Sequence, residues 1–400
     1  MVDTKTLVEK GSKTQEKKTP GAVGLLERGA FDQLFQVLQA QGYTIVGPTV
    51  REGVILYDEL ESPDELPIGW TDEQEAGTYR MQKREDEALF GYTVGPHSWK
   101  RFLFPPKHRL FRATRGKDGF DIEEDKYDGP NYAFLGVRAC ELQAMAIQDN
   151  VFLGGDHVDP HYRSRRESAL IIAVNCGKAG QTCFCSSMGS GPKAGTGFDL
   201  ALTELISKDG HAFLLEVGSK KGNKIFKKLP IEKAGKKEQK AADAVVAEAE
   251  AQMGRQLDTE GLKDLLYRNY QNPHWEEVAE KCLSCANCTM VCPTCFCSTV
   301  EEMTDLSGDH AERWRRWDSC FTMDFTYIHG GSVRQSTRAR YRQWMTHKLA
   351  TWFDQFGTSG CVGCGRCITW CPVGIDLTEE ARALRASDQG ELQTGMQAEA

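Results

Sequence analysis

The sequence predicts an α/β domain in the N-terminal half, followed by a smaller, mainly α-helical domain that is rich in cysteine. Two short apolar runs, residues 132–137 and 169–174, have the length and composition of buried strands. A helix-like stretch, residues 141–149, and a polar connection, residues 159–166, separate them. The order strand, helix, strand predicts a parallel pair of strands, which is typical of α/β proteins.

The length of 400 residues, 40% of them hydrophobic, predicts two or three domains with ordinary cores. A stretch rich in Ala, Glu and Lys follows the α/β half and is typical of a surface helix or linker. The two ends of the chain are polar and predict disorder. We expect a disordered arm at 1–20, the α/β domain at 21–235, a helical linker at 236–274, the cysteine-rich domain at 275–380 and a flexible tail at 381–400.

Overall charge and hydropathy argue against two classes of partner. The formal net charge of -8 does not suit nucleic acid as the main partner. No apolar run approaches the length that is needed to span a bilayer. Because the chain has 15 cysteines and no apolar leader after Met1, we expect it in the reducing cytoplasm.

Two cysteine runs, residues 282–293 and 361–372, each have the spacing C-x-x-C-x-x-C-x-x-x-C-P. This spacing is the ligand run of bacterial proteins that bind [4Fe–4S] clusters, and it makes the second domain ferredoxin-type. In such proteins the fourth cysteine of one run binds the cluster of the other run. The predicted ligands are therefore Cys282, Cys285, Cys288 and Cys371 for the first [4Fe–4S] cluster, and Cys361, Cys364, Cys367 and Cys292 for the second.

Other uses of these cysteines fit the pattern less well. Zinc needs only two C-x-x-C pairs, so a third cysteine and a C-P ending, both duplicated, would be redundant. Disulfide scaffolds are typical of short secreted chains. A pair of neighbouring clusters passes single electrons and does not transform a substrate, so we assign no catalytic residue.

The segment between the two runs, residues 293–360, is long and is expected to be helical. Apolar residues recur there at helical spacing and predict one buried stripe, formed by Tyr341, Trp344, Met345, Leu349 and Trp352. Helices between two ligand loops resemble the α-helical ferredoxin modules of electron-transfer subunits. The segment is also basic, and we expect most of its cations to face solvent and some, among residues such as Arg313 or Lys348, to lie near a cluster and raise its potential.

Four further cysteines come together at the ends of the two predicted strands. Cys140 and Cys176 directly follow these strands, and Cys183 and Cys185 lie in the loop after the second one. Since parallel strands end at the same edge of a sheet, the four thiols predict a possible third [4Fe–4S] cluster. The alternative is that they are ordinary reduced cysteines, a residue type that is often buried.

Three cysteines remain without a predicted cluster. Cys295 and Cys297 belong to a T-C-F-C sequence that also occurs at residues 182–185. They could donate hydrogen bonds to cluster sulfurs or serve as alternative ligands, and Cys320 is expected to pack in the core. We find no G-x-x-x-x-G-K-[ST] loop and no convincing dinucleotide-binding βαβ unit, so FAD or NAD(P) is expected in a partner subunit.

Several of these motifs together resemble one known family. They are residues 136–141, 159–166, 173–176, 182–189, 292–297 and 361–367. They are similar to the 4Fe-4S dicluster β subunit of sulfhydrogenase-type, NAD(P)-linked [NiFe] hydrogenases, and also to the electron-transfer subunit of anaerobic sulfite reductases. The resemblance covers roughly residues 90–380. It implies a multi-subunit complex in which one companion holds FAD and binds NAD(P)H, and others hold the [NiFe] centre or the sulfite-reducing haem.

The favoured hypothesis is an iron–sulfur electron-transfer subunit of a cytoplasmic [NiFe] hydrogenase. It would relay electrons between a flavin subunit that binds NAD(P)H and the small and large hydrogenase subunits. The same role in an anaerobic sulfite reductase is the alternative. A third hypothesis is an autonomous thiol or iron–sulfur enzyme or sensor, with Arg138 as a positive group. It lacks a general base beside the cysteines.

Overall fold

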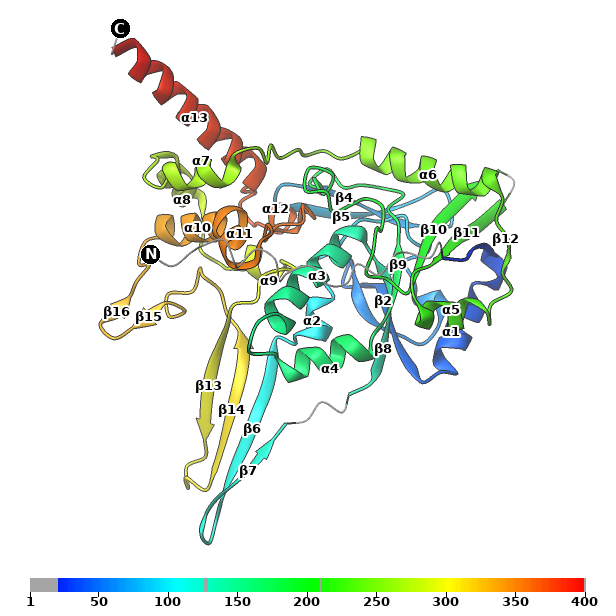
Figure 1. Ribbon diagram of the computed structural model, residues 1–400, viewed down its shortest axis with the longest axis horizontal. Coiled ribbons are helices and arrows are strands. Elements are labelled where there is room, and N and C mark those ends of the chain that lie inside the picture. The colour runs from blue at the N-terminus through cyan, green and yellow to red at the C-terminus, as the bar shows by residue number, and fades with distance from the viewer. Residues whose placement is uncertain (1–20, 126–128, 209, 399–400) are drawn as a thin grey trace, which may run out of the picture.

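A computed structural model of the protein describes residues 21–125, 129–208 and 210–398 (Figure 1). The predicted N-terminal arm, residues 1–20, lies outside the described residues. A large mixed sheet forms one side of the molecule, and the helices of the cysteine-rich part gather on the other. In the part of the chain that is described, no helix is both long enough and apolar enough to cross a membrane.

The large sheet has eight strands, and its centre is parallel. In sheet order the strands are β12 (Glu232–Lys233), β1 (Val23–Glu27), β11 (Gly210–Val217), β10 (Leu200–Ser207), β9 (Leu170–Val174), β8 (Asn131–Val137), β2 (Tyr43–Arg51) and β3 (Val54–Leu60). Strand β8 runs parallel to β2 and β9, and β9 runs parallel to β10. The predicted parallel pair is therefore confirmed, and every residue of β9 is buried, as in strands that are covered on both faces.

Helices of the α/β part include the predicted crossover helix and a helix where a polar connection was expected. They are α1 (Asp32–Gln39), α2 (Lys100–Leu103), α3 (Ala139–Leu153), α4 (Pro160–Ser168), α5 (Lys220–Phe226) and α6 (Lys236–Ala251). Helix α3 confirms the predicted crossover helix. The polar connection expected at 159–166 is instead helix α4, because Asp159 caps it by accepting a hydrogen bond from Tyr162 N at 2.8 Å and Pro160 opens its first turn.

The cysteine-rich part is built from α7 (Leu262–Arg268), α8 (His274–Lys281), α9 (Asn287–Met290), α10 (Thr337–Thr346), a π-helical turn η3 (His347–Thr351), α11 (Trp352–Phe356), α12 (Arg366–Thr369) and α13 (Leu377–Ala398). The predicted apolar stripe of α10 to α11 is confirmed, since all five of its side chains are buried. Leu262, Leu265 and Leu266 of α7 pack in the same core. The second half of the expected linker thus contributes to this domain.

The expectation that residues 293–360 are helical is wrong for the first half of that segment. Strands β13 (Ser298–Thr304) and β14 (His310–Trp317) occupy it, followed by the short pair β15 (Tyr327–Ile328) and β16 (Gly331–Ser332). β14 pairs with β6 (Lys107–Gly116), which pairs with β7 (Gly119–Glu124), in a sheet that extends away from the body (Figure 1). Glu312 of β14 forms ion pairs with Arg109 and Arg112 of β6 across this junction, so charged side chains contribute to the pairing of the two strands.

The flexible tail expected from residue 381 is also incorrect at its start. Helix α13 continues through this segment, and Ala381 and Leu384 are buried in the core. Arg268 of α7 donates to the carboxylate of Asp388 at 2.7 Å. Beyond this contact the helix projects from the body toward the C-terminus (Figure 1).

A buried ion pair joins the two parts of the molecule. Arg366, inside the second cysteine run, donates from Nη2 to Glu141 Oε1 at 2.5 Å, and the two side chains are 0% and 1% exposed. Glu141 Oε2 also accepts from Tyr57 Oη at 2.8 Å and Trp99 Nε1 at 3.0 Å. The guanidinium of Arg366 further donates to the carbonyl oxygen of Gly95 at 2.8 Å. Both carboxylate oxygens of Glu141 therefore have hydrogen-bond partners.

Replacement of Glu141 by Gln should lower the free energy of unfolding by about 3–5 kcal/mol, because it leaves the guanidinium of Arg366 buried without its counter-charge. Chemical denaturation of the anaerobically purified protein measures this change. The control is Asp243→Asn, which breaks a surface pair with Lys193 whose side chains are 67% and 50% exposed and should cost less than about 1 kcal/mol. Equal losses for the two variants would contradict the assigned role of the buried pair.

Candidate metal centre

The two ligand loops have the same backbone conformation at equivalent positions. In the first loop Ser284 and Ala286 have φ of 52° and 67°, and in the second Gly363 and Gly365 have φ of 64° and 75°. These left-handed positions coil each loop tightly. In each loop the first of these residues directs its backbone N–H at a cysteine Sγ, from Ser284 at 3.5 Å and from Gly363 at 3.4 Å. Each loop thus forms a backbone N–H contact with the sulfur of its own first cysteine.

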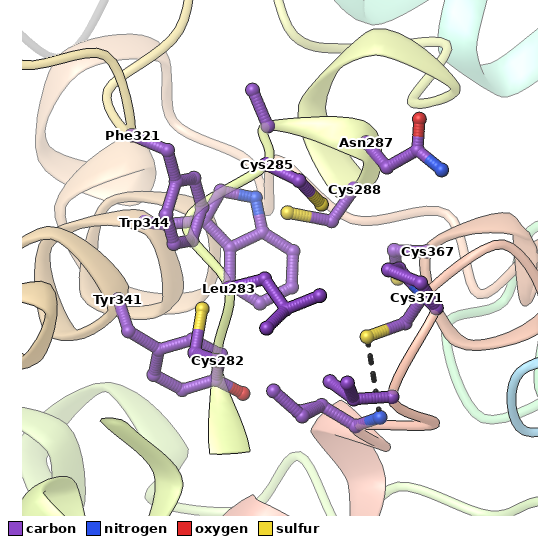
Figure 2. Close-up of a pocket in the computed structure, with 14 residues that line it drawn as sticks. Cys282, Leu283, Cys285, Asn287, Cys288, Phe321, Tyr341, Trp344, Cys367 and Cys371 are labelled. Atoms are coloured by element: carbon purple, nitrogen blue, oxygen red, sulfur yellow. Dashed lines mark hydrogen bonds between the residues drawn. The ribbon is translucent and has the colours of Figure 1, made fainter. Parts of the chain in front are cut away.

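The first ring of thiols surrounds a hollow of about 410 Å³. Its members, here called the first ring, are Cys282, Cys285, Cys288 and Cys371. Figure 2 shows Cys282 and Cys371 on opposite sides of the pocket and Cys285 and Cys288 above them, with Phe321, Trp344 and Tyr341 on the left. Cys285 is exposed, so this ring reaches the surface.

The second ring surrounds a hollow of about 300 Å³ deeper in the molecule. Its members, the second ring, are Cys292, Cys361, Cys364 and Cys367. Lys348 from the π-helical turn lines the same hollow, and its Nζ lies 3.2 Å from Cys292 Sγ. Its ammonium group is buried with the thiols. The fourth cysteine of each run therefore lies with the first three of the other run.

The third ring lies at the edge of the large sheet, in a hollow of about 360 Å³. Its members, the third ring, are Cys140, Cys176, Cys183 and Cys185. Cys140 is in the first turn of α3 after β8, and Cys176 follows β9. The expected meeting of the two strand ends is thus observed. Arg138 lines this hollow as well.

The three rings form a continuous row. Cys367 lines the hollows of both the first and the second ring. Cys364 lines the hollows of both the second and the third ring. At each junction a single side chain thus borders both neighbouring hollows. The order along the row is first, second, third.

The second ligand loop packs directly against the T-C-F-C loop that carries two cysteines of the third ring. A Cβ at Gly363 would lie 2.6 Å from the Phe184 carbonyl, and one at Gly365 would lie 2.4 Å from Thr182 O. Phe184 N donates to Gly363 O at 2.9 Å. Glycine is required there both for its φ and for this close approach. The first loop carries Ser284 and Ala286 at the equivalent positions.

Comparison with known proteins agrees with this geometry. Residues 281–375 match the family described as 4Fe-4S dicluster domain. Over 357 residues the chain is 32% identical to "Sulfhydrogenase 2 subunit beta" of Pyrococcus furiosus, an alignment that covers 86% of this chain and 93% of that protein. The chain belongs to the sulfhydrogenase β-subunit family. No solved structure matches it.

The donor sets of the three rings in this sulfhydrogenase β-subunit homologue have the chemistry that clusters require. Among the described residues, no three His, Cys, Asp or Glu side chains are placed to hold a single metal ion. Each ring instead presents four thiols around a hollow of hundreds of cubic ångströms, and four cysteines are the ligand set of a [4Fe–4S] cluster.

Buried cations at the second and third rings support this fit. The guanidinium of Arg138 donates to the carbonyl oxygens of Phe90 at 2.8 Å and Tyr92 at 2.9 Å, and its Nε has no partner among the described residues. Within the same described part, no carboxylate forms an ion pair with Arg138 or Lys348. A buried cation without a counter-charge is costly, whereas a cluster held by four thiolates is an anion. The protein therefore has positive charge where that anion would sit.

The thiols themselves are tuned by burial and by these cations. Burial raises the pKa of Cys183 and that of Cys361, each to about 12. A hydrogen bond with Cys295 and the charge of Lys348 hold the pKa of Cys292 well below its usual range. Burial alone would lower the pKa of Lys348, but Cys292 and Cys295 raise it well above the usual range. Metal binding at most of these thiols would therefore release protons.

Sequence reasoning missed two of the cations. Arg366 lies inside a ligand run, but its partner Glu141 is 225 positions away, and nothing local indicates the pair. Lys100 is buried and donates from Nζ to Cys295 O at 3.1 Å. Of the basic residues between the two runs, Lys348 contacts ring thiols. Arg313 instead pairs with Glu302 across two strands.

The three cysteines without a predicted cluster lie together. Cys295, Cys297 and Cys320 line a fourth hollow of about 270 Å³, separate from the three rings. Cys320 packs against the helical core, as expected, but it also faces this hollow. Neither T-C-F-C cysteine at 295 and 297 lines the hollow of the second ring.

Replacement of Gly365 by Ala should destabilise the protein more than replacement of Gly357 by Ala. Both glycines have left-handed φ, 75° and 71°, but a Cβ at Gly357 meets nothing within 4 Å. The control should therefore cost about 1–2 kcal/mol for the backbone alone, and Gly365→Ala about 1–3 kcal/mol more for overpacking. Unfolding curves of the two variants measure the difference, and indistinguishable curves would refute the close packing of Gly365 on Thr182.

Proposed function

We propose that the chain is the iron–sulfur electron-transfer subunit of a multi-subunit [NiFe] hydrogenase. In this proposal it relays electrons between a subunit that holds FAD and binds NAD(P)H and the hydrogenase small and large subunits. The observation that carries the proposal is the continuous row of thiol rings in a member of the sulfhydrogenase β-subunit family. Because the row of rings spans two domains, it suits electron transfer through the chain better than catalysis at a single site.

In this proposal each ring holds one [4Fe–4S] cluster, which accepts and releases one electron at a time. The ligands are Cys282, Cys285, Cys288 and Cys371 in the first ring, Cys361, Cys364, Cys367 and Cys292 in the second, and Cys140, Cys176, Cys183 and Cys185 in the third. Support comes from the common hollow that each set of four lines.

The surrounding residues hold and tune these sites. Lys348 and Arg138 provide positive charge at the second and third rings, which stabilises a more negative centre and so raises its reduction potential. At the first ring the backbone N–H of Ile375 donates a hydrogen bond to Cys371 Sγ at 3.3 Å. Hydrogen bonds to ligand sulfurs also affect the potential of a cluster.

The first ring is the more exposed end of the row, where one partner protein can approach. Cys285 is exposed there, and the neighbouring Leu283 and Val373 are 63% and 40% exposed. At the other end Cys140 and Cys185 are buried. We place the chain in the cytoplasm, since none of its 15 cysteines forms a disulfide.

Purification of the intact complex under anaerobic conditions tests the proposed function. We expect nickel-containing hydrogenase subunits to co-purify with the chain, together with a flavin-containing subunit. A complex that lacked nickel but contained a sulfite-reducing haem protein would overturn the hydrogenase assignment. Catalytic turnover of a substrate by the isolated chain would overturn the proposed role as an electron relay.

Replacement of Cys292 by Ser should damage the cluster of Cys361, Cys364 and Cys367, despite the distance in the sequence. The reason is that its thiol lines their hollow and not the hollow of the first ring. EPR spectra of the reduced variant and of Cys285→Ser should lose different signals. If both variants lost the same signal, the crossover pairing would be wrong.

Replacement of Cys176 by Ser should lower the iron content by about four atoms per chain if the third ring holds a cluster. Colorimetric iron and acid-labile sulfide assays measure this loss. Ser186→Ala, a change beside Cys185 in the same loop, is the control and should keep the full iron content. Unchanged iron in Cys176→Ser would mean that the third-ring cysteines are ordinary thiols.

A further inference from the structure

A fourth set of thiols lies beside the row, outside the two dicluster ligand runs and the third ring. Cys295 and Cys297 precede β13, and Cys320 follows β14, so the hairpin brings the three together. The π-helical turn η3 closes the hollow with His347 and Lys348. Turns of π-helix inside longer helices are frequent at functional sites.

The sequence around two of these cysteines repeats that of the third ring. Thr182-Cys183-Phe184-Cys185 and Thr294-Cys295-Phe296-Cys297 share the pattern T-C-F-C. In both copies the threonine is fully buried, and both cysteines face one hollow. The third ring adds two cysteines from other segments, whereas this hollow adds Cys320 and His347. Each site therefore combines two cysteines of a T-C-F-C sequence with two residues from other segments, and one of these is a histidine instead of a cysteine at the fourth hollow.

His347 has an unprotonated ring nitrogen, which is the form that binds a metal. His347 Nε2 lies 2.9 Å from the side-chain oxygen of Gln355. Because an amide oxygen can only accept, this contact places the proton on Nε2 and leaves a lone pair on Nδ1. Metal-binding histidines typically donate their second ring N–H to such an acceptor.

Buried donors around the hollow lack acceptors. The indole Nε1 of Trp352, which lines this hollow, has no hydrogen-bond partner among the described residues. Trp344 borders both this hollow and the first ring, and its Nε1 is likewise without a partner in the described part of the chain. Buried donors are seldom left unsatisfied, and the sulfides of a cluster are acceptors for N–H groups.

Two buried ammonium groups also converge on Cys295. Lys348 Nζ lies 3.6 Å from Cys295 Sγ, and Lys100 Nζ donates to Cys295 O. Neither forms an ion pair with a carboxylate among the residues described. Lys100 instead lies over the ring of Trp317 at 3.8 Å. Positive charge is thus concentrated at a site that three cysteine thiols line.

We propose that Cys295, Cys297, Cys320 and His347 Nδ1 hold an additional [4Fe–4S] cluster. The three thiols lose their protons as they bind iron, and the neutral imidazole binds without losing one. All four proposed ligand residues line this one hollow, as the four cysteines of the second ring line theirs. Lys348 borders this hollow and that of the second ring, and Trp344 borders this hollow and that of the first, so the site adjoins the row at both rings.

Iron and acid-labile sulfide content of the intact, anaerobically purified complex tests the proposal. Cys320→Ser and Cys297→Ser should each lose about four irons per chain and keep the EPR signals that Cys292→Ser and Cys176→Ser remove. Ser298→Ala, beside Cys297, should keep the full iron content. Parental iron content in both cysteine variants would overturn the proposal. The iron content of the variants does not depend on which subunits co-purify. The assay can therefore refute the additional cluster without refuting the proposed function.

A second measurement uses the unaltered protein, in case a cysteine variant fails to fold. No histidine lines the three rings in the described structure, so within this chain the proposal places only His347 on a cluster. A histidine signal from a partner subunit would persist in His347→Gln, so the coupling that this variant loses is the one that reports His347. Pulsed EPR of the reduced complex labelled with ¹⁵N-histidine should show a strong nitrogen coupling, and His347→Gln should abolish it. Absence of this coupling in the unaltered complex would refute His347 as a ligand and, with it, the proposed ligand set.

Discussion

The buried ion pair of Glu141 and Arg366 determines how the two domains are positioned. Glu141 directly follows Cys140 of the third ring, and Arg366 lies between Cys364 and Cys367 of the second. Removing two charges from water is expensive, and the cost is recovered only when every donor and acceptor is well placed. The pair therefore tolerates little displacement. Together with the packing of the second ligand loop on the T-C-F-C loop at residues 182–185, the pair holds the second and third rings beside each other.

Charge distinguishes the rings from one another. Lys348 and Arg366 line the second hollow and Arg138 lines the third, but in the described structure no lysine or arginine lines the first. The first ring is instead bordered by aromatic side chains and by solvent at Cys285. Because buried cations favour the reduced form of a cluster, the same four-cysteine ligand set would have different potentials along the row. If each ring holds a cluster, as proposed, side chains that are not ligands would thus give the clusters different reduction potentials.

The thiol rings could be predicted from the sequence because their ligands are local, either by spacing within a run or by following two strands that pair. The sheet of β14 and β6 could not, since Trp314 pairs with Arg109 far upstream and charged residues obscure the alternation of the strand. The helical start of the expected tail was readable in principle from Ala381 and Leu384, one helical turn apart. Long-range pairs such as Glu141 with Arg366 leave no local signal.

The second ring lies at the centre of the cysteine arrangement, with a T-C-F-C loop on each side. Thr182 packs against Gly365 on one side, and Thr294 accepts from Lys348 at 3.2 Å on the other. Thr294 also donates to Gly360 O, directly before Cys361. Both threonines therefore anchor their loops to the second ligand run. A repeated motif with the same anchoring on two sides is better explained by a repeated task than by packing, because packing alone does not require two cysteines at fixed spacing.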